Sequence, residues 1–364
     1  MKLFNCDHCG NLLYFENREC GKCGHRLGYI PQTASLSALE PMEPEEDGTA
    51  VFRAMADGGT YRFCDNVVND GCNWLVPTGS ADRFCLACRH NRTIPDLSIP
   101  GNLEKWQKLE LAKHRLFYTL IQLGLPLPTV QEHPEGLVFD FKDDTPEEPV
   151  LTGHDNGVIT IALKEADDAE RAKMQQEMGE QYRTLIGHFR HEVGHFFWDR
   201  LVRDGDRLEE CRAVFGDDQL DYQQALQNRY ENGPPVGWEE NFISAYASVH
   251  PWEDFAETWA HYLHIVDTLE TANAFGLQVR AKADVSGEMA TKIDFGPHEV
   301  DRIEDLITAW VPLTVAVNSL NRSMGESDLY PFVLNSAVEA KLAFIHTLIH
   351  DQRHAMVQSE PQAA

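Results

Sequence analysis

Residues 187–199 read GHFRHEVGHFFWD, a stretch that contains an HExxH pattern with histidines at His191 and His195. On an α-helix, residues four positions apart lie on one face, so both imidazoles can reach a single metal ion. Glu192 stands beside them and could accept a proton from a metal-activated water. The alternative is an exposed polar helix turn. The aromatic residues on both sides instead favour a buried helix, in which two histidines and a glutamate need partners.

A second aromatic-rich stretch, residues 251–261 (PWEDFAETWAH), offers the missing ligand. A zinc ion held by two histidines needs at least one further protein ligand. Glu253 and Glu257 lie four residues apart and share a helix face, so one can bind metal while the other supports a ligand histidine. Asp254 points about 100° away and is the weaker candidate. A solvated acidic helix start is the alternative, and the flanking aromatic residues disfavour it.

Other titratable residues lie near these motifs, and their roles stay open. His188 either competes as a ligand or lines a cleft, and Asp199 is either a hydrogen-bond acceptor for a ligand histidine or a solvated residue. Most histidines near a site are core or rim residues, which is what we expect of His250, His261 and His264. Cys211 stands apart from the other cysteines, and we expect a buried core thiol rather than a nucleophile.

Eight of the nine cysteines lie in the first quarter of the chain. CxxC pairs place two thiolates on a tight turn, as tetrahedral zinc requires. The first set consists of two such pairs and predicts a structural zinc site: Cys6, Cys9, Cys20 and Cys23. The second set combines one ordinary pair with one widened pair, and reduced buried cysteines are its alternative: Cys64, Cys72, Cys85 and Cys88. Both sets are expected to be closed sites that fold small modules.

The pattern along the chain predicts an α+β protein. Two small β-rich zinc modules precede a predominantly helical domain, with a linker suggested by Pro, Ser and Glu between the modules. We expect strands at 137–141 and 158–163, and helices from 102, over 167–203 and near 219–230, 253–271, 298–322 and 332–356, with Pro312 kinking or breaking the helix near 298–322. The expected divisions are 1–30 (zinc ribbon), 31–50 (linker), 51–97 (second zinc module), 101–358 (helical domain) and 359–364 (disordered tail).

The charge and hydropathy of the chain argue against some classes of binding partner. The chain carries 31 basic and 58 acidic residues, a formal net charge of −27. This balance argues against sequence-independent nucleic-acid binding and against docking on an anionic membrane. No apolar run approaches the roughly 20 residues of a spanning helix, and the first residues lack a signal-peptide pattern. We therefore expect a cytoplasmic protein.

The two motifs together resemble the gluzincin metallopeptidases, especially their lethal factor-like branch. This resemblance implies that Glu253 is the third metal ligand and that Tyr246 helps to stabilise an oxyanion. It also implies that Glu257 does not bind the metal itself but lies next to the metal ligands and supports them. The whole chain, with its Cys-rich start, GHFRHEVGHFFWD and HPWEDFAETWAHY, is also similar to bacterial proteins named putative zinc-binding metallopeptidases with an amino-terminal zinc ribbon. The helical domain is then expected to be zincin-like.

The expectation that follows is a zinc-dependent metallopeptidase with one catalytic and two structural zinc ions. Zinc would activate a water molecule, with Glu192 as general base, to hydrolyse a peptide or protein substrate. The strand at 158–163 would offer an edge for an extended peptide. The zinc modules could bind a protein partner or cover the cleft. Two alternatives stay open: a non-catalytic zinc-binding scaffold on a peptidase-like fold, and a metal-dependent hydrolase of a non-peptide amide.

Overall fold

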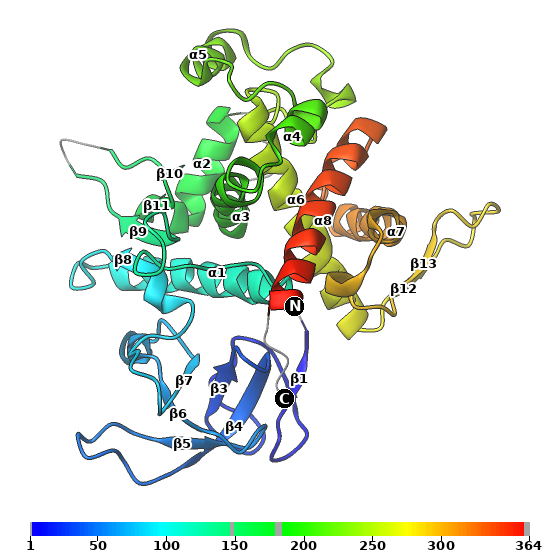
Figure 1. The fold of residues 1–364 in the computed structure, drawn as a ribbon. Coiled ribbons are helices and arrows are strands. Elements are labelled where there is room, and N and C mark those ends of the chain that lie inside the picture. The colour runs from blue at the N-terminus through cyan, green and yellow to red at the C-terminus, as the bar shows by residue number, and fades with distance from the viewer. Residues whose placement is uncertain (1, 146–148, 179–183, 360–364) are drawn as a thin grey trace. The chain divides into compact units, whose positions relative to one another are not determined.

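The computed structural model describes residues 2–145, 149–178 and 184–359 (Figure 1). The expected disordered tail falls almost wholly outside these residues. The chain forms two compact units, each described by itself below. The first comprises residues 1–122 and 126–167, and the second comprises residues 123–125 and 168–364.

The first unit begins with a β-rich region that contains both cysteine sets. A short antiparallel pair, β1 and β2, flanks the first CxxC turn. Five further strands form one antiparallel sheet in the order β3-β4-β5-β6-β7. Its core includes Ile30, Leu39, Phe52 and Leu75. The strands are β1 Phe4–Asn5, β2 Leu12–Leu13, β3 Leu27–Ile30, β4 Ser35–Pro41, β5 Phe52–Ala54, β6 Thr60–Phe63 and β7 Leu75–Pro77.

The linker predicted at 31–50 is wrong, because strand β4 lies within it. β4 pairs with β3 on one side and with β5 on the other, and Leu36, Ala38 and Leu39 are buried. The carboxylate of Asp7 also accepts a hydrogen bond from the Ala38 amide at 3.0 Å. The linker prediction rested on the Pro, Ser and Glu content of this stretch. The local structure is instead decided by a short apolar run that pairs with the strands on both sides.

The first unit continues with helix α1, Asn102–Gln122, and a four-stranded sheet in the order β10-β11-β9-β8. The predicted boundary at residue 101 therefore does not coincide with the division between the compact units. β11 lies between β10 and β9, so the expected free edge at 158–163 is wrong. The remaining elements are η1 Asp65–Asn69, η2 Cys88–His90, β8 Asn91–Thr93, β9 Val138–Lys142, β10 Gly153–Asp155, β11 Val158–Ala162 and η3 Leu163–Ala166.

The second unit is mainly helical, which together with the β-rich start agrees with the α+β expectation. The continuous helix predicted over 167–203 is instead α2, a separate α3 and a π-helical turn, η4. Residues 179–183, between α2 and α3, lie outside the described part. The elements are α2 Asp168–Met178, α3 Leu185–Phe197, η4 Trp198–Arg203, α4 Leu208–Phe215, α5 Tyr222–Asn232, η5 Trp238–Glu240, α6 Pro251–Ala274, β12 Gln278–Arg280, β13 Ala290–Lys292, η6 Pro297–Glu299, α7 Ile303–Ser323 and α8 Ser336–Ser359.

Helix α3 begins as a separate helix at Leu185, and Thr184 caps its amino-terminal end. The Thr184 hydroxyl accepts a hydrogen bond from the Gly187 amide at 3.1 Å, which satisfies one of the free donors at the helix start. Helix α7 runs through Pro312 rather than ending there. Within the described ranges, no helix is long and apolar enough to cross a membrane.

The packing of α3 against α6 positions the two predicted motifs. Gly194 lies so close to α6 that a Cβ atom on it would be 3.0 Å from the Ala256 Cα atom. The ring of Phe197 stacks on that of Trp259 at a centroid distance of 4.9 Å. Both helices are largely buried. Because they pack closely, the HExxH face of α3 lies against the start of α6.

Candidate metal centre

Helices α3 and α6 bring His191, His195 and Glu253 together at one point. The two histidine Nε2 atoms are 3.1 Å apart. Glu253 Oε2 lies 3.0 Å from Nε2 of His191 and 3.4 Å from Nε2 of His195. Ligand atoms around a tetrahedral zinc ion are about 3.3 Å from one another, so this triangle of donor atoms fits a zinc ion.

The charges in this triangle are strongly coupled. Burial alone would lower the pKa of His191, but hydrogen bonds and charge interactions with Glu253 and Glu257 outweigh it and raise that pKa well above its ordinary value. Burial would likewise raise the pKa of Glu253, but the two histidines hold it well below its ordinary value. The ionised carboxylate of Glu253 is thus buried, and a buried negative charge needs a compensating positive charge nearby. A bound cation can provide that charge.

The second glutamate of α6, Glu257, orients His191. Nδ1 of His191 donates a hydrogen bond to Glu257 Oε1 at 2.8 Å, and the Ser244 hydroxyl donates to Glu257 Oε2 at 2.5 Å. In the neutral ring that a metal ion requires, the proton stays on Nδ1 and the lone pair of Nε2 is directed at the donor triangle. This is the arrangement by which a carboxylate fixes the tautomer of a metal-binding histidine.

Two tyrosines border the triangle, one of which the sequence did not indicate. The Tyr222 hydroxyl donates a hydrogen bond to Glu253 Oε1 at 2.6 Å. The ring of Tyr246 lies 5.8 Å from that of His191. Burial, followed by the charge of Glu253, raises the pKa of both phenols, and the charge of Glu192 adds to the effect. The Glu192 side chain is itself buried.

Tyr222 is the functional candidate that sequence reasoning missed. It is the first residue of α5, 31 positions before Glu253, and no motif connects the two. The indole of Trp252 also covers the ring of His195 at a centroid distance of 3.6 Å. The short segment around Tyr222 carries no spacing pattern that could have indicated its contact with Glu253.

The remaining histidines near the motifs make other contacts. His250 caps α6, with Nδ1 accepting from the Trp252 amide at 3.1 Å and Nε2 donating to the Leu220 carbonyl at 3.0 Å. His261 contacts the Tyr330 hydroxyl at 2.8 Å, and His264 contacts the Arg190 guanidinium. His188 does not belong to the group of three close donors.

The acidic alternatives are also engaged elsewhere. Asp254 forms a buried ion pair with Lys341 of α8 at 2.6 Å, which fits its predicted direction away from the metal face. Burial raises the pKa of this carboxyl to about 7. Asp199 pairs with Arg203 at 3.3 Å.

The eight amino-terminal cysteines form the two groups that their spacing indicated. In each group the sulfur atoms lie within 4.8 Å of one another. Measured pairs are Cys6–Cys23 at 3.7 Å, Cys9–Cys20 at 3.6 Å and Cys72–Cys85 at 3.7 Å. Sulfur ligands of a tetrahedral zinc ion lie about 3.8 Å apart, so both groups have the dimensions of zinc sites. Cys211 is a buried thiol apart from them, and burial raises its pKa to about 12.

Comparison with known proteins gives two family matches that together cover most of the chain. Residues 3–99 match a zinc-ribbon domain, and residues 102–348 match a family described as "putative zinc-binding metallo-peptidase". Uncharacterized proteins of Mycobacterium bovis and of two Mycobacterium tuberculosis strains are 40% identical over 353 residues, which is 96% of this chain and 96% of each relative. No solved structure matches. The chain belongs to the putative zinc-binding metallo-peptidase family and carries a zinc-ribbon region at its amino terminus.

Proposed function

We propose that the protein is a zinc-dependent metallopeptidase of the gluzincin type, with a zincin-like catalytic region. His191, His195 and Glu253 would hold the catalytic zinc. The observation that carries the proposal is the triangle of their donor atoms, with sides of 3.0 to 3.4 Å, together with the buried side chain of Glu192, the residue that follows His191. The two cysteine groups would hold structural zinc ions.

The side chains around this triangle would have different roles in peptide hydrolysis. When bound, zinc supplies a Lewis acid that polarises the scissile carbonyl and makes water more acidic. Glu192 accepts the proton of the attacking water and passes it to the leaving amine. The Tyr246 phenol, kept protonated by its buried and acidic surroundings, donates a hydrogen bond to the developing oxyanion.

Two further residues position the ligands. Tyr222 donates to Oε1 of Glu253, which leaves Oε2 as the oxygen that faces both histidines. Glu257 holds His191 through Nδ1, and Ser244 holds Glu257 in turn. Hydrogen bonds of this kind fix the orientation of metal ligands.

The proposal is tested by Glu192→Gln, which keeps the size of the side chain and removes the base. The variant should retain its zinc and lose cleavage of a mixed-sequence peptide library by about 10²–10⁴-fold, as measured by mass spectrometry. Glu209→Gln, on an exposed position of α4, is the matched control and should cleave like the wild type.

Two results would contradict the assignment. Wild-type cleavage rates in Glu192→Gln would show that the base is another group. A wild-type protein that carries zinc at the triangle and cleaves no member of the library would overturn the peptidase assignment. The scaffold and the non-peptide amidase would then be the functions to examine.

A further inference from the structure

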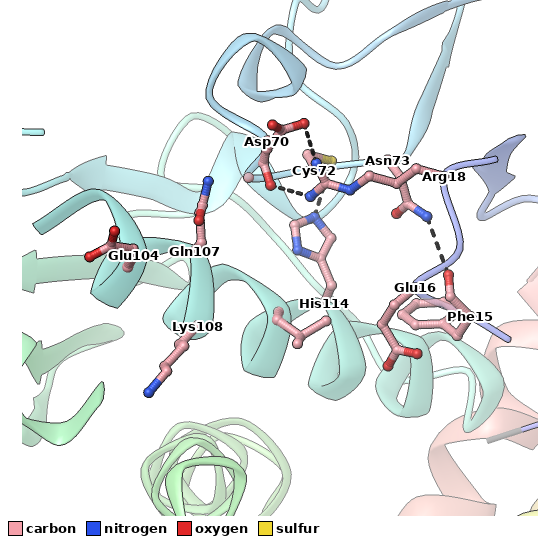
Figure 2. A pocket seen from close by; sticks show the side chains of 12 residues that line it. Phe15, Glu16, Arg18, Asp70, Cys72, Asn73, Glu104, Gln107, Lys108 and His114 are labelled. Atoms are coloured by element: carbon pink, nitrogen blue, oxygen red, sulfur yellow. Dashed lines mark hydrogen bonds and ion pairs between the residues drawn. The ribbon is translucent and has the colours of Figure 1, made fainter. Parts of the chain in front are cut away.

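The second cysteine group contains a fifth metal donor, His114 of helix α1. Nε2 of His114 lies 3.2 Å from the sulfur of Cys72, 3.5 Å from that of Cys88 and 4.0 Å from that of Cys85. Figure 2 shows the imidazole extending from α1 toward Cys72. Four cysteines and one histidine therefore compete for the four positions of a tetrahedral zinc ion.

The hydrogen bond on the far side of the ring fixes the tautomer of a neutral His114. Nδ1 lies 2.6 Å from the backbone carbonyl oxygen of Glu110, and a carbonyl oxygen only accepts hydrogen bonds. Nδ1 must then carry the proton, and the lone pair of Nε2 is directed at the three sulfurs. Histidines that bind metals commonly donate their other ring N–H to a carbonyl or carboxylate in this way.

The distances around Nε2 fit a coordination tetrahedron. With Zn–N and Zn–S bonds of about 2.05 and 2.3 Å, a nitrogen ligand lies about 3.6 Å from each sulfur ligand. The three measured distances from His114 scatter around this value. The sulfurs of Cys72 and Cys85, 3.7 Å apart, also fit. His114 and these three cysteines therefore make a complete ligand set without Cys64.

Charge favours the set that includes the histidine. All four cysteines and His114 are buried, so water screens the charge of the site only weakly. Beside the site, Glu110 Oε2 lies 3.6 Å from the Cys88 sulfur and forms a fully buried ion pair with Lys113 at 2.9 Å, so the charge of Lys113 compensates that of Glu110. A zinc ion with four thiolates carries a net charge of −2, and one with three thiolates and a neutral imidazole carries −1. The less charged site costs less to bury.

We propose that the second zinc ion is held by Cys72, Cys85, Cys88 and His114, and that Cys64 lies outside its coordination shell. Cys64 is the member set apart in sequence, because the seven residues between it and Cys72 include the 3₁₀ turn η1. With this ligand set, zinc fastens α1, the first helix of the region that matches the metallopeptidase family, directly to the zinc-ribbon region.

The same ligands border a surface hollow. Cys72 and His114 line a cavity of about 650 Å³ together with Arg18 and Asp70, whose side chains are paired with each other (Figure 2).

Cadmium-113 NMR of the full-length chain, loaded with ¹¹³Cd²⁺ in place of zinc, tests the ligand set without any substitution. The ¹¹³Cd resonance moves upfield when an imidazole replaces a thiolate. We expect one resonance at the four-thiolate position, from the first cysteine group, and a second one upfield at the position of three thiolates and one nitrogen. Two resonances at the four-thiolate position would overturn the proposal.

Two variants sharpen the assignment. His114→Ala should move only the upfield resonance, downfield to the four-thiolate position as Cys64 enters the shell. Cys64→Ser should leave both resonances in place. The reverse pattern, with His114→Ala unchanged and Cys64→Ser shifted upfield, contradicts the proposal. If His114→Ala does not fold, the wild-type spectrum and Cys64→Ser still decide between the two ligand sets.

Discussion

The two tyrosines at the metal triangle differ in what they contact, so their substitutions should have separable effects. Tyr222 donates to the oxygen of Glu253 that faces away from the histidines, whereas Tyr246 lies beside His191. Tyr222→Phe should therefore weaken zinc binding, by about 10-fold or more, since it removes a hydrogen bond that orients a ligand. Tyr246→Phe should keep the zinc affinity and lower kcat by about 10²–10³-fold.

Zinc affinity by chelator competition and kcat by peptide cleavage distinguish the two. An unchanged kcat in Tyr246→Phe would remove it from oxyanion stabilisation. Equal losses of kcat in the two variants, with zinc affinity kept in both, would mean that Tyr222 also acts on the substrate.

His261 makes the second unit sensitive to acid. Burial lowers its pKa to about 4, against about 6.5 for a histidine in an unfolded chain. Between these values the unfolded chain binds a proton that the folded chain does not. The contribution of His261 to stability is therefore complete above pH 6.5 and is lost as the pH falls toward 4, by at most about 3 kcal/mol.

Replacing this histidine should reduce the pH dependence of the free energy of unfolding. His261→Gln retains a polar group for the Tyr330 hydroxyl and does not titrate. Its unfolding free energy should fall less steeply than that of the wild type between pH 6.5 and 4. Metal release is common to both proteins, so the difference in slope reports on His261. The exposed His354→Gln should keep the wild-type slope, and an equal slope in all three would contradict the prediction.

At the scale of elements, the site depends on how closely α3 approaches α6. A methyl group at Gly194 would lie 3.0 Å from Ala256 Cα and 3.2 Å from Trp259 Cβ, so the helices would have to move apart. Gly194→Ala should destabilise the protein by about 1–3 kcal/mol and weaken zinc binding at the triangle, because ligands from the two helices separate.

Chemical unfolding and zinc titration measure these two effects. Gly153→Ala serves as the control, since a Cβ there has no heavy atom within 4 Å. Full stability together with wild-type zinc affinity in Gly194→Ala would show that the helix spacing is not critical for the site.

The sequence indicated those parts of the candidate site in which the residues are regularly spaced, and the structure brings these residues together. His191 and His195, Glu253 and Glu257, and the CxxC pairs each follow from helix or turn geometry within a few residues. Tyr222 and His114 reach their sites through tertiary contacts with residues tens of positions away in the sequence. The periodicity of a single helix or turn cannot indicate such contacts. Strand β4 was missed for a similar reason, because its partners rather than its composition make it a strand.

At the scale of the whole molecule, the chain should hold three zinc ions. Elemental analysis of the purified wild type should give about three per chain, and of the His191→Ala/His195→Ala double variant about two. Both cysteine groups are independent of this substitution and serve as the internal reference. Identical zinc content in the two proteins would mean that the HExxH helix is not a metal site in the purified protein, and the scaffold function would become the leading one.

The five-stranded sheet has a consequence for how the amino-terminal region gains and loses metal. β3 leads away from the first cysteine group, while β6 and β7 enclose the start of the second, and hydrogen bonds connect all of them across one sheet. Zinc ions bound at the two cysteine groups would therefore stabilise a single cooperative folding unit rather than two independent modules. Removing either ion should lower the affinity for the other, so a chelator should strip both in one concerted transition.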